Sequence, residues 1–311
     1  MSRTETAVSL RALTRRFGAA TAIDALSLEV KAGELFGIVG PDGAGKTTLL
    51  RMLAGVLPVS EGEAIVLGHD VRRDPERVKH EVAYMAQRFG LYEDLTVREN
   101  IMFYADLYRV PRAERPARLE RLYAFSRLGE FEQRLAGKLS GGMKQKLSLC
   151  CALIHRPRVL LLDEPTFGVD PISRRDLWLI LHEMVAEGIT VIVTTSYLDE
   201  AERCDRVAML HEGRLLALST PLQLQESLTG VMFAVHTDSA RAARLAALSL
   251  HGVRAATLFG DTVHVLTAAG DAEQLMTQFH QQRVAVTEIE RIDPSLEDVF
   301  IHLVGKNEQH G

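Results

Sequence analysis

A glycine-rich loop at residues 40–48 constrains this chain more than any other feature of its sequence. The loop reads Gly-Pro-Asp-Gly-Ala-Gly-Lys-Thr-Thr and joins an apolar strand expected at 35–39 to a helical run. Glycines let backbone N–H groups turn inward around phosphate oxygens, and the helix presents the positive end of its dipole to the same charge. Lys46 can bind the outer phosphates, and Thr47 can offer a hydroxyl to Mg²⁺. The loop predicts ATP or GTP binding by Gly40, Asp42, Gly43, Gly45, Lys46, Thr47 and Thr48.

Two adjacent acids, Asp163 and Glu164, end a second apolar strand expected at 159–163. Neighbouring side chains on a strand point to opposite sides, so the two carboxylates can have different tasks. Asp163 can hold Mg²⁺ through water, while Glu164 can polarise the water that attacks the γ-phosphate. Acids are also common at solvated strand ends, and it is the phosphate loop that favours the catalytic interpretation.

The order of apolar runs predicts two domains, at 1–224 and 225–311. Residues 8–220 alternate strand-like and helix-like segments, which is typical of an α/β fold with a mostly parallel sheet. Helical spacing between 93 and 139, broken by Pro111 and Pro116, indicates a helical insertion at about 88–140. After Pro221 the order becomes βαββαβ, with a hairpin at Gly260-Asp261, which predicts a small ferredoxin-like α+β domain.

Composition narrows the class of protein. The 311 residues carry 36 basic and 41 acidic side chains, a net charge of −5, so we expect no nucleic-acid partner. Apolar runs such as those at 149–154 and 159–162 fall far short of the roughly 20 residues that cross a bilayer. The first residues do not resemble an export signal. The three cysteines, Cys150, Cys151 and Cys204, are expected to be buried free thiols.

The run Leu-Ser-Gly-Gly-Met-Lys-Gln at 139–145 opens an amphipathic helix. Ser140 is placed as its N-cap, and Gly141 and Gly142 leave backbone N–H groups exposed behind it. Such a helix start can bind an anion such as a γ-phosphate. On physical grounds alone, an ordinary capped helix explains the run equally well.

Taken together, these motifs resemble the ATP-binding subunits of ABC transporters over essentially the whole chain. The family order is kept: the loop at 40–48, Gln87 in Tyr-Met-Ala-Gln, the run at 139–145, Asp163-Glu164, and Asp170 in Gly-Val-Asp. Phe17 matches the aromatic side chain that stacks on adenine in this family, although a core phenylalanine is the alternative. The resemblance implies the P-loop NTPase fold of an ABC ATPase, with ATP and Mg²⁺ as ligands.

The resemblance also implies a head-to-tail dimer of two ATPase domains, as a homodimer or a heterodimer. Ser140, Gly141 and Gly142 would then serve the nucleotide of the partner chain. Gln87 would contact the γ-phosphate and Mg²⁺ and link them to the helical insertion, which grips the permease. Asp170 would contact the opposite site across the dimer.

The finer similarity is to the ATPases of ABC-2 type exporters. It rests on Phe-Gly-Leu-Tyr-Glu-Asp-Leu-Thr-Val-Arg-Glu-Asn at 89–100 and on Pro-Ser-Leu-Glu-Asp-Val-Phe at 294–300. The runs at 40–43 and 195–200 resemble the first ATPase half of bacterial tandem exporters. The chain is therefore expected to drive efflux through separate ABC-2 type permease subunits, from the cytoplasmic face of the cell membrane.

Two residues depart from the usual pattern. Asp42 puts a carboxylate beside the phosphates, which repels them unless it points outward or is paired. Ser196 stands where the family normally has a histidine that hydrogen-bonds the γ-phosphate, so turnover at this chain's own site is expected to be slow. Three interpretations stay open: an ordinary homodimer, a slowly hydrolysing member of an asymmetric ATPase pair, and a soluble ABC ATPase that acts on ribosomes or DNA.

Overall fold

The structure, a computed structural model, describes residues 5–87 and 90–308 and divides into two compact units. The N-terminal unit is Met1–Leu218 and the C-terminal unit is Ser219–Gly311. Helix α8 (Pro221–Glu226) packs against α11 (Leu296–Glu308), and for this reason it belongs to the second unit. The boundary therefore lies a few residues before the expected one at 224/225.

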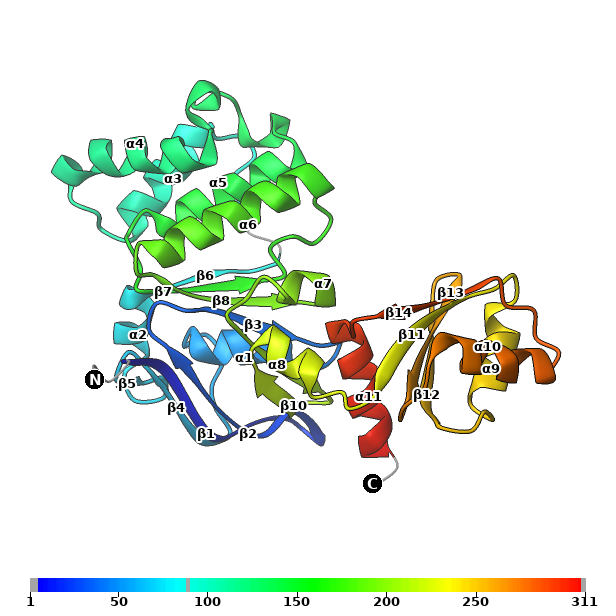
Figure 1. Ribbon diagram of the computed structural model, residues 1–311. Helices are drawn as coiled ribbons and strands as arrows, with labels where there is room; N and C mark the ends of the chain where they lie inside the picture. The colour runs from blue at the N-terminus through cyan, green and yellow to red at the C-terminus, as the bar shows by residue number, and fades with distance from the viewer. Residues whose placement is uncertain (1–4, 88–89, 309–311) are drawn as a thin grey trace. The chain divides into compact units, whose positions relative to one another are not determined.

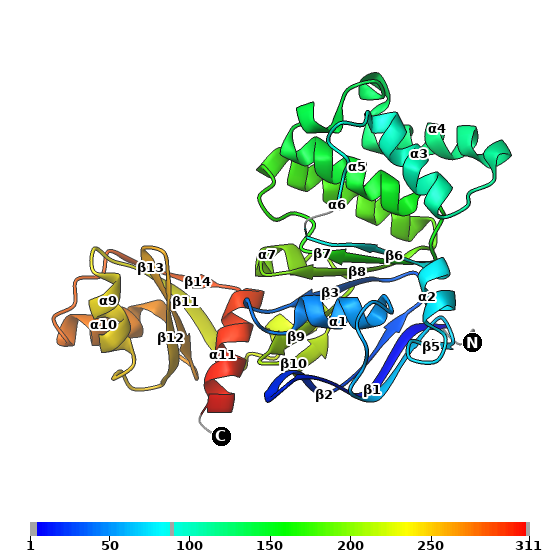
Figure 2. The same ribbon diagram turned by 180° about the vertical axis from the view of Figure 1, so that it is seen from behind.

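A six-stranded sheet forms the centre of the N-terminal unit, in the order β10-β9-β3-β8-β7-β6 (Figures 1 and 2). The pairs β6·β7, β7·β8, β8·β3 and β3·β9 are parallel, which confirms the α/β prediction. Every residue of β3, β7 and β8 is buried, as expected for a parallel sheet covered on both faces. The strands are β3 (Leu35–Val39), β6 (Val82–Met85), β7 (Val159–Asp163), β8 (Thr190–Thr195), β9 (Arg206–His211) and β10 (Arg214–Ser219).

A second, antiparallel sheet in this unit was not predicted. Its order is β2-β1-β4-β5, and the turn between β1 and β2 contains Gly18 with a φ of 58°. Register shifts along β1·β2 indicate bulges that bend the ribbon. The strands are β1 (Thr6–Phe17), β2 (Ala20–Lys31), β4 (Glu61–Val66) and β5 (His69–Asp70).

Helices fill and cover the layers of the N-terminal unit. Leu49, Leu50 and Met52 of α1 lie in one core with side chains of both sheets, so α1 is packed between them. Figure 2 shows α5 and α6 on the other face of the six-stranded sheet, with α3 and α4 beyond them. The helices are α1 (Lys46–Leu53), α2 (Pro75–Glu81), α3 (Val97–Leu107), α4 (Arg115–Ser126), α5 (Gly141–Leu153), α6 (Pro171–Ala186) and α7 (Leu198–Ala201).

The predicted helical insertion consists of α3 and α4 with three short 3₁₀ turns, at Arg112–Glu114, Gly129–Phe131 and Ala136–Lys138. Helix α3 begins with a capping box between Thr96 and Glu99. Pro111 and Pro116 precede or start helical turns, where proline is compatible with the backbone. Arg88 and Phe89, at the start of the predicted insertion and of the exporter-like run, lie outside the described residues.

The C-terminal unit is the predicted ferredoxin-like domain. Its antiparallel sheet has the order β12-β13-β11-β14, with α9 and α10 packed on one face. The last strand begins at Glu288, which pairs with His236 at the end of β11. The elements are β11 (Val231–His236), α9 (Ala240–Ala247), β12 (Val253–Phe259), β13 (Thr262–Thr267), α10 (Ala272–Gln281) and β14 (Glu288–Ile292).

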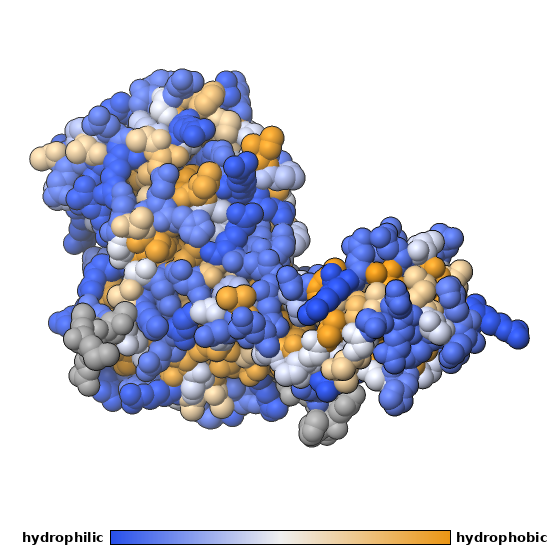
Figure 3. All heavy atoms as spheres, in the orientation of Figure 1, coloured by the Kyte–Doolittle hydropathy of each residue, from blue (hydrophilic) through white to orange (hydrophobic). Residues whose placement is uncertain are grey.

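The surface and the thiols agree with a globular protein. In the face shown in Figure 3, hydrophilic residues dominate the N-terminal unit and apolar residues form small groups. Cys150, Cys151 and Cys204 are free and buried, as predicted, and burial raises the pKa of Cys150 to about 12. Within residues 5–87 and 90–308, every helix is too short or too polar to cross a bilayer.

Candidate functional site

The predicted nucleotide site lies where four parallel strands end. The phosphate loop follows β3, Gln87 lies just beyond β6, Asp163 ends β7 and Ser196 follows β8. Because the strands are parallel, these ends meet at one edge of the sheet, the usual place for ligands in α/β folds. A cavity of about 220 Å³ opens there, lined by Ala22, Asp42, Gly43, Ala44, Gly45, Lys46, Thr47, Thr48, Gln87 and Glu164.

The loop's shape depends on two of its glycines. A Cβ at Gly40 would lie 2.2 Å from the carbonyl oxygen of Leu210 on β9. Gly45 has a φ of 97°, and a Cβ there would lie 2.5 Å from the carbonyl oxygen of Ala22. Glycine is thus needed at both positions, and it lets the loop pack tightly against β2 and β9.

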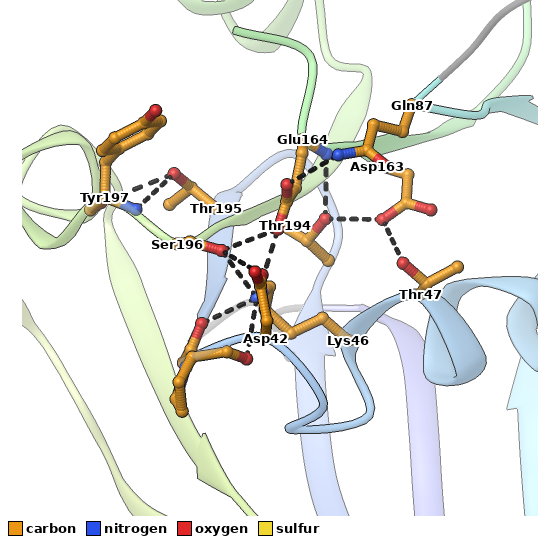
Figure 4. A network of polar contacts seen from close by, with 12 residues as sticks. Asp42, Lys46, Thr47, Gln87, Asp163, Glu164, Thr194, Thr195, Ser196 and Tyr197 are labelled. Carbon is orange, nitrogen blue, oxygen red and sulfur yellow. Dashed lines mark hydrogen bonds and ion pairs between the residues drawn. The ribbon is translucent and has the colours of Figure 1, made fainter. Parts of the chain in front are cut away.

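Lys46 is only 5% exposed, and its ammonium group is held by the loop itself. Its Nζ donates to the carbonyl oxygens of Gly40 at 2.7 Å and Pro41 at 3.1 Å. It also donates to Ser196 Oγ at 2.9 Å and lies 3.1 Å from Oε1 of Glu164 (Figure 4). The loop therefore contains a fixed, desolvated positive charge at the place where phosphates are expected.

The Asp163 carboxylate is buried and held by three hydroxyls. Its Oδ1 accepts from Thr47 Oγ1 at 2.9 Å and from Thr194 Oγ1 at 3.0 Å, and its Oδ2 accepts from the Tyr84 hydroxyl at 3.1 Å. Burial, with the adjacent Asp163 charge, raises the pKa of Tyr84, so its phenol stays protonated and can donate. The paired oxygens of Thr47 and Asp163 are the hard ligands that Mg²⁺ prefers.

Glu164 lies between the other two residues predicted to be catalytic. Its Oε1 accepts from Ser196 Oγ at 2.7 Å and its Oε2 accepts from Gln87 Nε2 at 3.0 Å. Its backbone N–H donates to Thr194 Oγ1 at 3.0 Å. Asp42 is exposed, and its Oδ1 is 3.5 Å from Ser196 Oγ, so the serine proton goes to the nearer Glu164 (Figure 4).

Other predicted residues lie outside this cavity. Ser140 accepts from Met143 N at 3.3 Å, so it is the N-cap predicted for α5. Asp170 caps α6 by accepting from Ile172 N and Ser173 N. Phe17 is 47% exposed beneath the Arg15 guanidinium, 4.4 Å from its ring centre, and is therefore not a core side chain. In the described chain, Phe17, Ser140, Gly141, Gly142 and Asp170 do not line the cavity.

Three positions were missed from the sequence: Tyr84, Thr194 and Glu200. Tyr84 and Thr194 orient Asp163 and Glu164 through hydroxyl groups. Tyr84 lies near the end of β6, before Gln87, and Thr194 lies near the end of β8, before Ser196. This location is the only signal in the sequence that could have indicated them. Glu200 lies in the exporter-like run at 195–200, but its burial was not predictable from that run.

Gly142 and Gly141 differ sharply in the space around them, which gives a first prediction. A Cβ at Gly142 would lie 2.3 Å from Ser173 Cβ, whereas a Cβ at Gly141 meets nothing within 4 Å. We expect Gly142→Ala to lower the free energy of unfolding by about 1–3 kcal/mol through overpacking between α5 and α6. Gly141→Ala is the matched control and should leave it nearly unchanged. Urea denaturation of both variants measures the difference, and equal stabilities would contradict the predicted clash.

Comparisons with known proteins agree with this geometry. A family model described as ABC transporter matches residues 23–167, and one described as the C-terminal domain of ATP-binding protein DrrA1-3-like matches residues 220–304. The chain is 36% identical over 301 residues to Nod factor export ATP-binding protein I of Rhizobium sp. (strain N33), covering 96% of this chain and 97% of that protein. The chain belongs to the ATP-binding proteins of ABC transporters. The predicted resemblance is confirmed.

Other relatives of this ABC protein extend the comparison. It is 43% identical over 303 residues to the probable multidrug ABC transporter ATP-binding protein YbhF of Escherichia coli (strain K12). That match covers 96% of this chain and 52% of YbhF, so the chain spans about half the length of that relative. A solved ATP-binding subunit of an ABC transporter has a TM-score of 0.65 and 30% identity, covering 71% of this chain and 93% of that one.

A second solved structure is a dimeric ATP-binding cassette in a post-hydrolysis state, bound to ADP and phosphate. Its TM-score is 0.62 at 25% identity, covering 68% of this chain and 98% of that one. Together with the first structure, it confirms the predicted fold of an ABC ATPase.

Proposed function

We propose that this chain binds and hydrolyses ATP to drive an ABC-2 type exporter whose permease consists of separate membrane subunits. The cluster of Lys46, Glu164, Gln87 and Ser196 at the mouth of the phosphate loop carries this proposal. The names of the relatives support export: one is a probable multidrug transporter protein and another a Nod factor exporter protein. The C-terminal unit, expected at 225–311 and observed from Ser219, would be an accessory domain of the ATPase.

Each side chain at the sheet edge has a task in this mechanism. The loop N–H groups and Lys46 hold the phosphates of ATP, and Phe17 stacks on the adenine. Thr47, Asp163 and Gln87 would hold Mg²⁺ directly or through water, where it would supply positive charge to neutralise the phosphates. Glu164 orients and polarises the attacking water, and Gln87 holds one of its oxygens.

A second ABC ATPase domain would complete each site. Ser140, Gly141 and Gly142 would bind the γ-phosphate held by the partner, since they begin a helix and lie outside this chain's own cavity. Asp170 would contact the opposite site from the start of α6. The partner is a second copy of this chain or a different ATPase.

The helical insertion offers a surface for the permease. Tyr92 and Phe103 are 47% and 38% exposed, their ring centres lie 4.7 Å apart, and Leu107 on the same helix as Phe103 is 60% exposed. Exposed apolar and aromatic side chains in one region are typical of an interaction surface. Docking there would place the chain on the cytoplasmic face of the cell membrane. In the sequence, the insertion directly follows Gln87, which would connect the permease surface to the nucleotide site.

Ser196 is proposed to make turnover at this site slow. The serine hydroxyl has a single proton, which it donates to Glu164 at 2.7 Å, and it accepts from Lys46 at 2.9 Å. With both interactions made, no proton is left for the γ-phosphate. A histidine at this position would supply a second N–H donor, and for this reason the chain is proposed as the slow member of an asymmetric ATPase pair.

Substitution of Lys46 tests the function as a whole. We expect Lys46→Met to raise the Kd for ATP by about 10–100-fold, because a charge-assisted contact with the phosphates is lost. Lys79→Met removes an exposed cation that pairs with Glu76 on α2 and serves as the control. Isothermal titration calorimetry with Mg-ATP measures the Kd of both variants. Unchanged binding by Lys46→Met, or no ATP binding by the wild type, would overturn the proposed function.

A further inference from the structure

One buried carboxylate connects the two segments that carry Glu164 and Ser196. Glu200, on α7, is 1% exposed. Its Oε2 accepts a hydrogen bond from Thr195 Oγ1 and another from Thr166 Oγ1, each at 2.8 Å. Thr195 directly precedes Ser196, and Thr166 lies in the turn that begins with Glu164. A single carboxylate oxygen therefore joins the end of β8 to the turn after β7.

The other oxygen of Glu200 faces α6. Its Oε1 lies 3.4 Å from Nε of Arg174, and Cζ of Arg174 lies 4.7 Å from the ring centre of Tyr197. The backbone N–H of Tyr197 in turn donates to Thr195 Oγ1 at 3.0 Å. The Arg174 guanidinium, on α6, thus compensates the buried negative charge of Glu200. A buried carboxylate without such a partner would destabilise the fold.

The partners of Glu200 show what this cluster holds in place. Both hydroxyl donors are themselves at most 1% exposed, so their positions are determined by packing as well as by the hydrogen bonds. Glu200 is 1% exposed and does not line the nucleotide cavity, so its side chain is too buried to touch a bound ATP. It is connected to the site through Thr166, in the turn that begins with Glu164, and through Thr195, which directly precedes Ser196. Ser196 Oγ in turn lies 2.7 Å from Oε1 of Glu164.

We propose that Glu200 is a positioning residue for ATP hydrolysis: by joining Thr195 to Thr166, it holds the Ser196 hydroxyl against Glu164. This inference rests on the proposed function, because it assigns Glu200 to the same reaction. It adds a residue outside the cavity to the site and explains why a charged side chain lies buried behind the end of β8. It also links the site to α6, the helix whose first turn is capped by Asp170.

Glu200→Gln tests this role with little change in side-chain size. The neutral amide cannot keep all the contacts of the carboxylate. With its oxygen in the place of Oε2, it keeps both threonine hydrogen bonds but turns its N–H₂ group toward the Arg174 guanidinium, which is also a donor. In the flipped orientation, the N–H₂ group faces both threonine hydroxyls, and they lose their acceptor. We expect kcat for ATP to fall about tenfold or more, since small displacements of catalytic groups cost this much, while the Kd for ATP stays within about threefold. Glu200→Asp, which keeps the charge, should recover part of kcat.

Glu34→Gln is the matched control. Glu34 is also a buried carboxylate, 7% exposed, and pairs with Arg206 at 3.1 Å. It accepts from the backbone N–H of Lys31 and directly precedes β3, so it lies at the end of that strand opposite to the phosphate loop. We expect Glu34→Gln to alter thermal stability with no change in kcat. Equal losses of kcat in the two variants would show that Glu200 acts only through general stability.

A double-mutant cycle with Ser196→Ala tests whether the effect of Glu200 on kcat depends on the Ser196 hydroxyl. If Glu200 acts by holding the Ser196 hydroxyl, adding Glu200→Gln to Ser196→Ala should lower kcat by less than about threefold, because there is no hydroxyl left to position. The same tenfold loss in both backgrounds would overturn the inference.

Hydrogen–deuterium exchange separates this inference from the proposed function. The Tyr197 N–H is protected by Thr195 Oγ1, so Glu200→Gln should speed exchange in peptides covering 195–198 by about tenfold, and Glu34→Gln should not. If the wild-type chain with its permease hydrolyses no ATP, the proposed hydrolysis is wrong and the exchange result decides the structural role of Glu200. Unchanged exchange in Glu200→Gln overturns that role.

Discussion

Glu164→Gln should lower the rate of ATP hydrolysis by about 10²–10⁴-fold, the usual contribution of a general base. Glutamine keeps the size of the side chain and can still form hydrogen bonds with Gln87 and Ser196, but its neutral amide cannot polarise the attacking water. Single-turnover hydrolysis at saturating Mg-ATP measures the loss. A variant that hydrolyses ATP at the wild-type rate would show that another group activates the water.

The same substitution should leave ATP binding intact or make it tighter. Glu164 places a negative charge 3.1 Å from Nζ of Lys46, so its removal leaves more of that positive charge for the phosphates. Glu187→Gln is a suitable control, because Glu187 forms an exposed ion pair with Arg121 in the same unit. If Glu164→Gln binds ATP more weakly and Glu187→Gln does not, the Glu164 carboxylate stabilises the phosphate loop. It would then not weaken ATP binding by competing with the phosphates for Lys46.

Ser196→His should raise the rate of ATP hydrolysis at this chain's own site by up to about 10²–10³-fold, the effect associated with one preorganised donor to the transition state. Imidazole reaches further than a hydroxyl and can offer an N–H to the γ-phosphate. ATPase assays on the native and Ser196→His chains, each purified with its permease subunits, compare the rates. The absence of any gain would reject slow turnover caused by Ser196 and favour an ordinary homodimer.

The gain must also depend on the general base. The double variant with Glu164→Gln and Ser196→His should remain as slow as Glu164→Gln alone, since a better phosphate donor cannot replace the polarised water. A double variant faster than Glu164→Gln would show that the introduced histidine itself acts as a base.

Much of the candidate site was predictable because its residues directly follow apolar strands. Asp163 ends such a run, Glu164 follows it, and Lys46 comes at the end of the loop that follows another. Parallel strands bring these ends to one edge of the sheet. The ferredoxin-like order of the C-terminal unit was likewise predictable, since its hairpin and two helices alternate in a simple pattern. Local periodicity and turn residues contain this information.

Long-range pairing was not predictable in the same way. Strands β1 and β4 pair through Val8 and Val66, which are far apart in the chain and carry no signal that they are partners. Hydroxyl residues such as Thr194 are too common for their spacing alone to indicate a role. The pairing and the hydroxyl contacts both depend on how distant segments pack, so neither could be read from periodicity.

The sequence by itself determined the ligand chemistry: a phosphate loop with Lys46 and Thr47, two carboxylates after a strand, and Ser196 in place of a histidine. Only the tertiary structure decided how these groups are held. The parallel order of the strands brings Thr47 to 2.9 Å from Asp163 across 116 positions of sequence, and it encloses Glu200 between β7, β8 and α6. The physical reason is that a buried carboxylate needs donors from several segments, and only the packed chain brings those donors together.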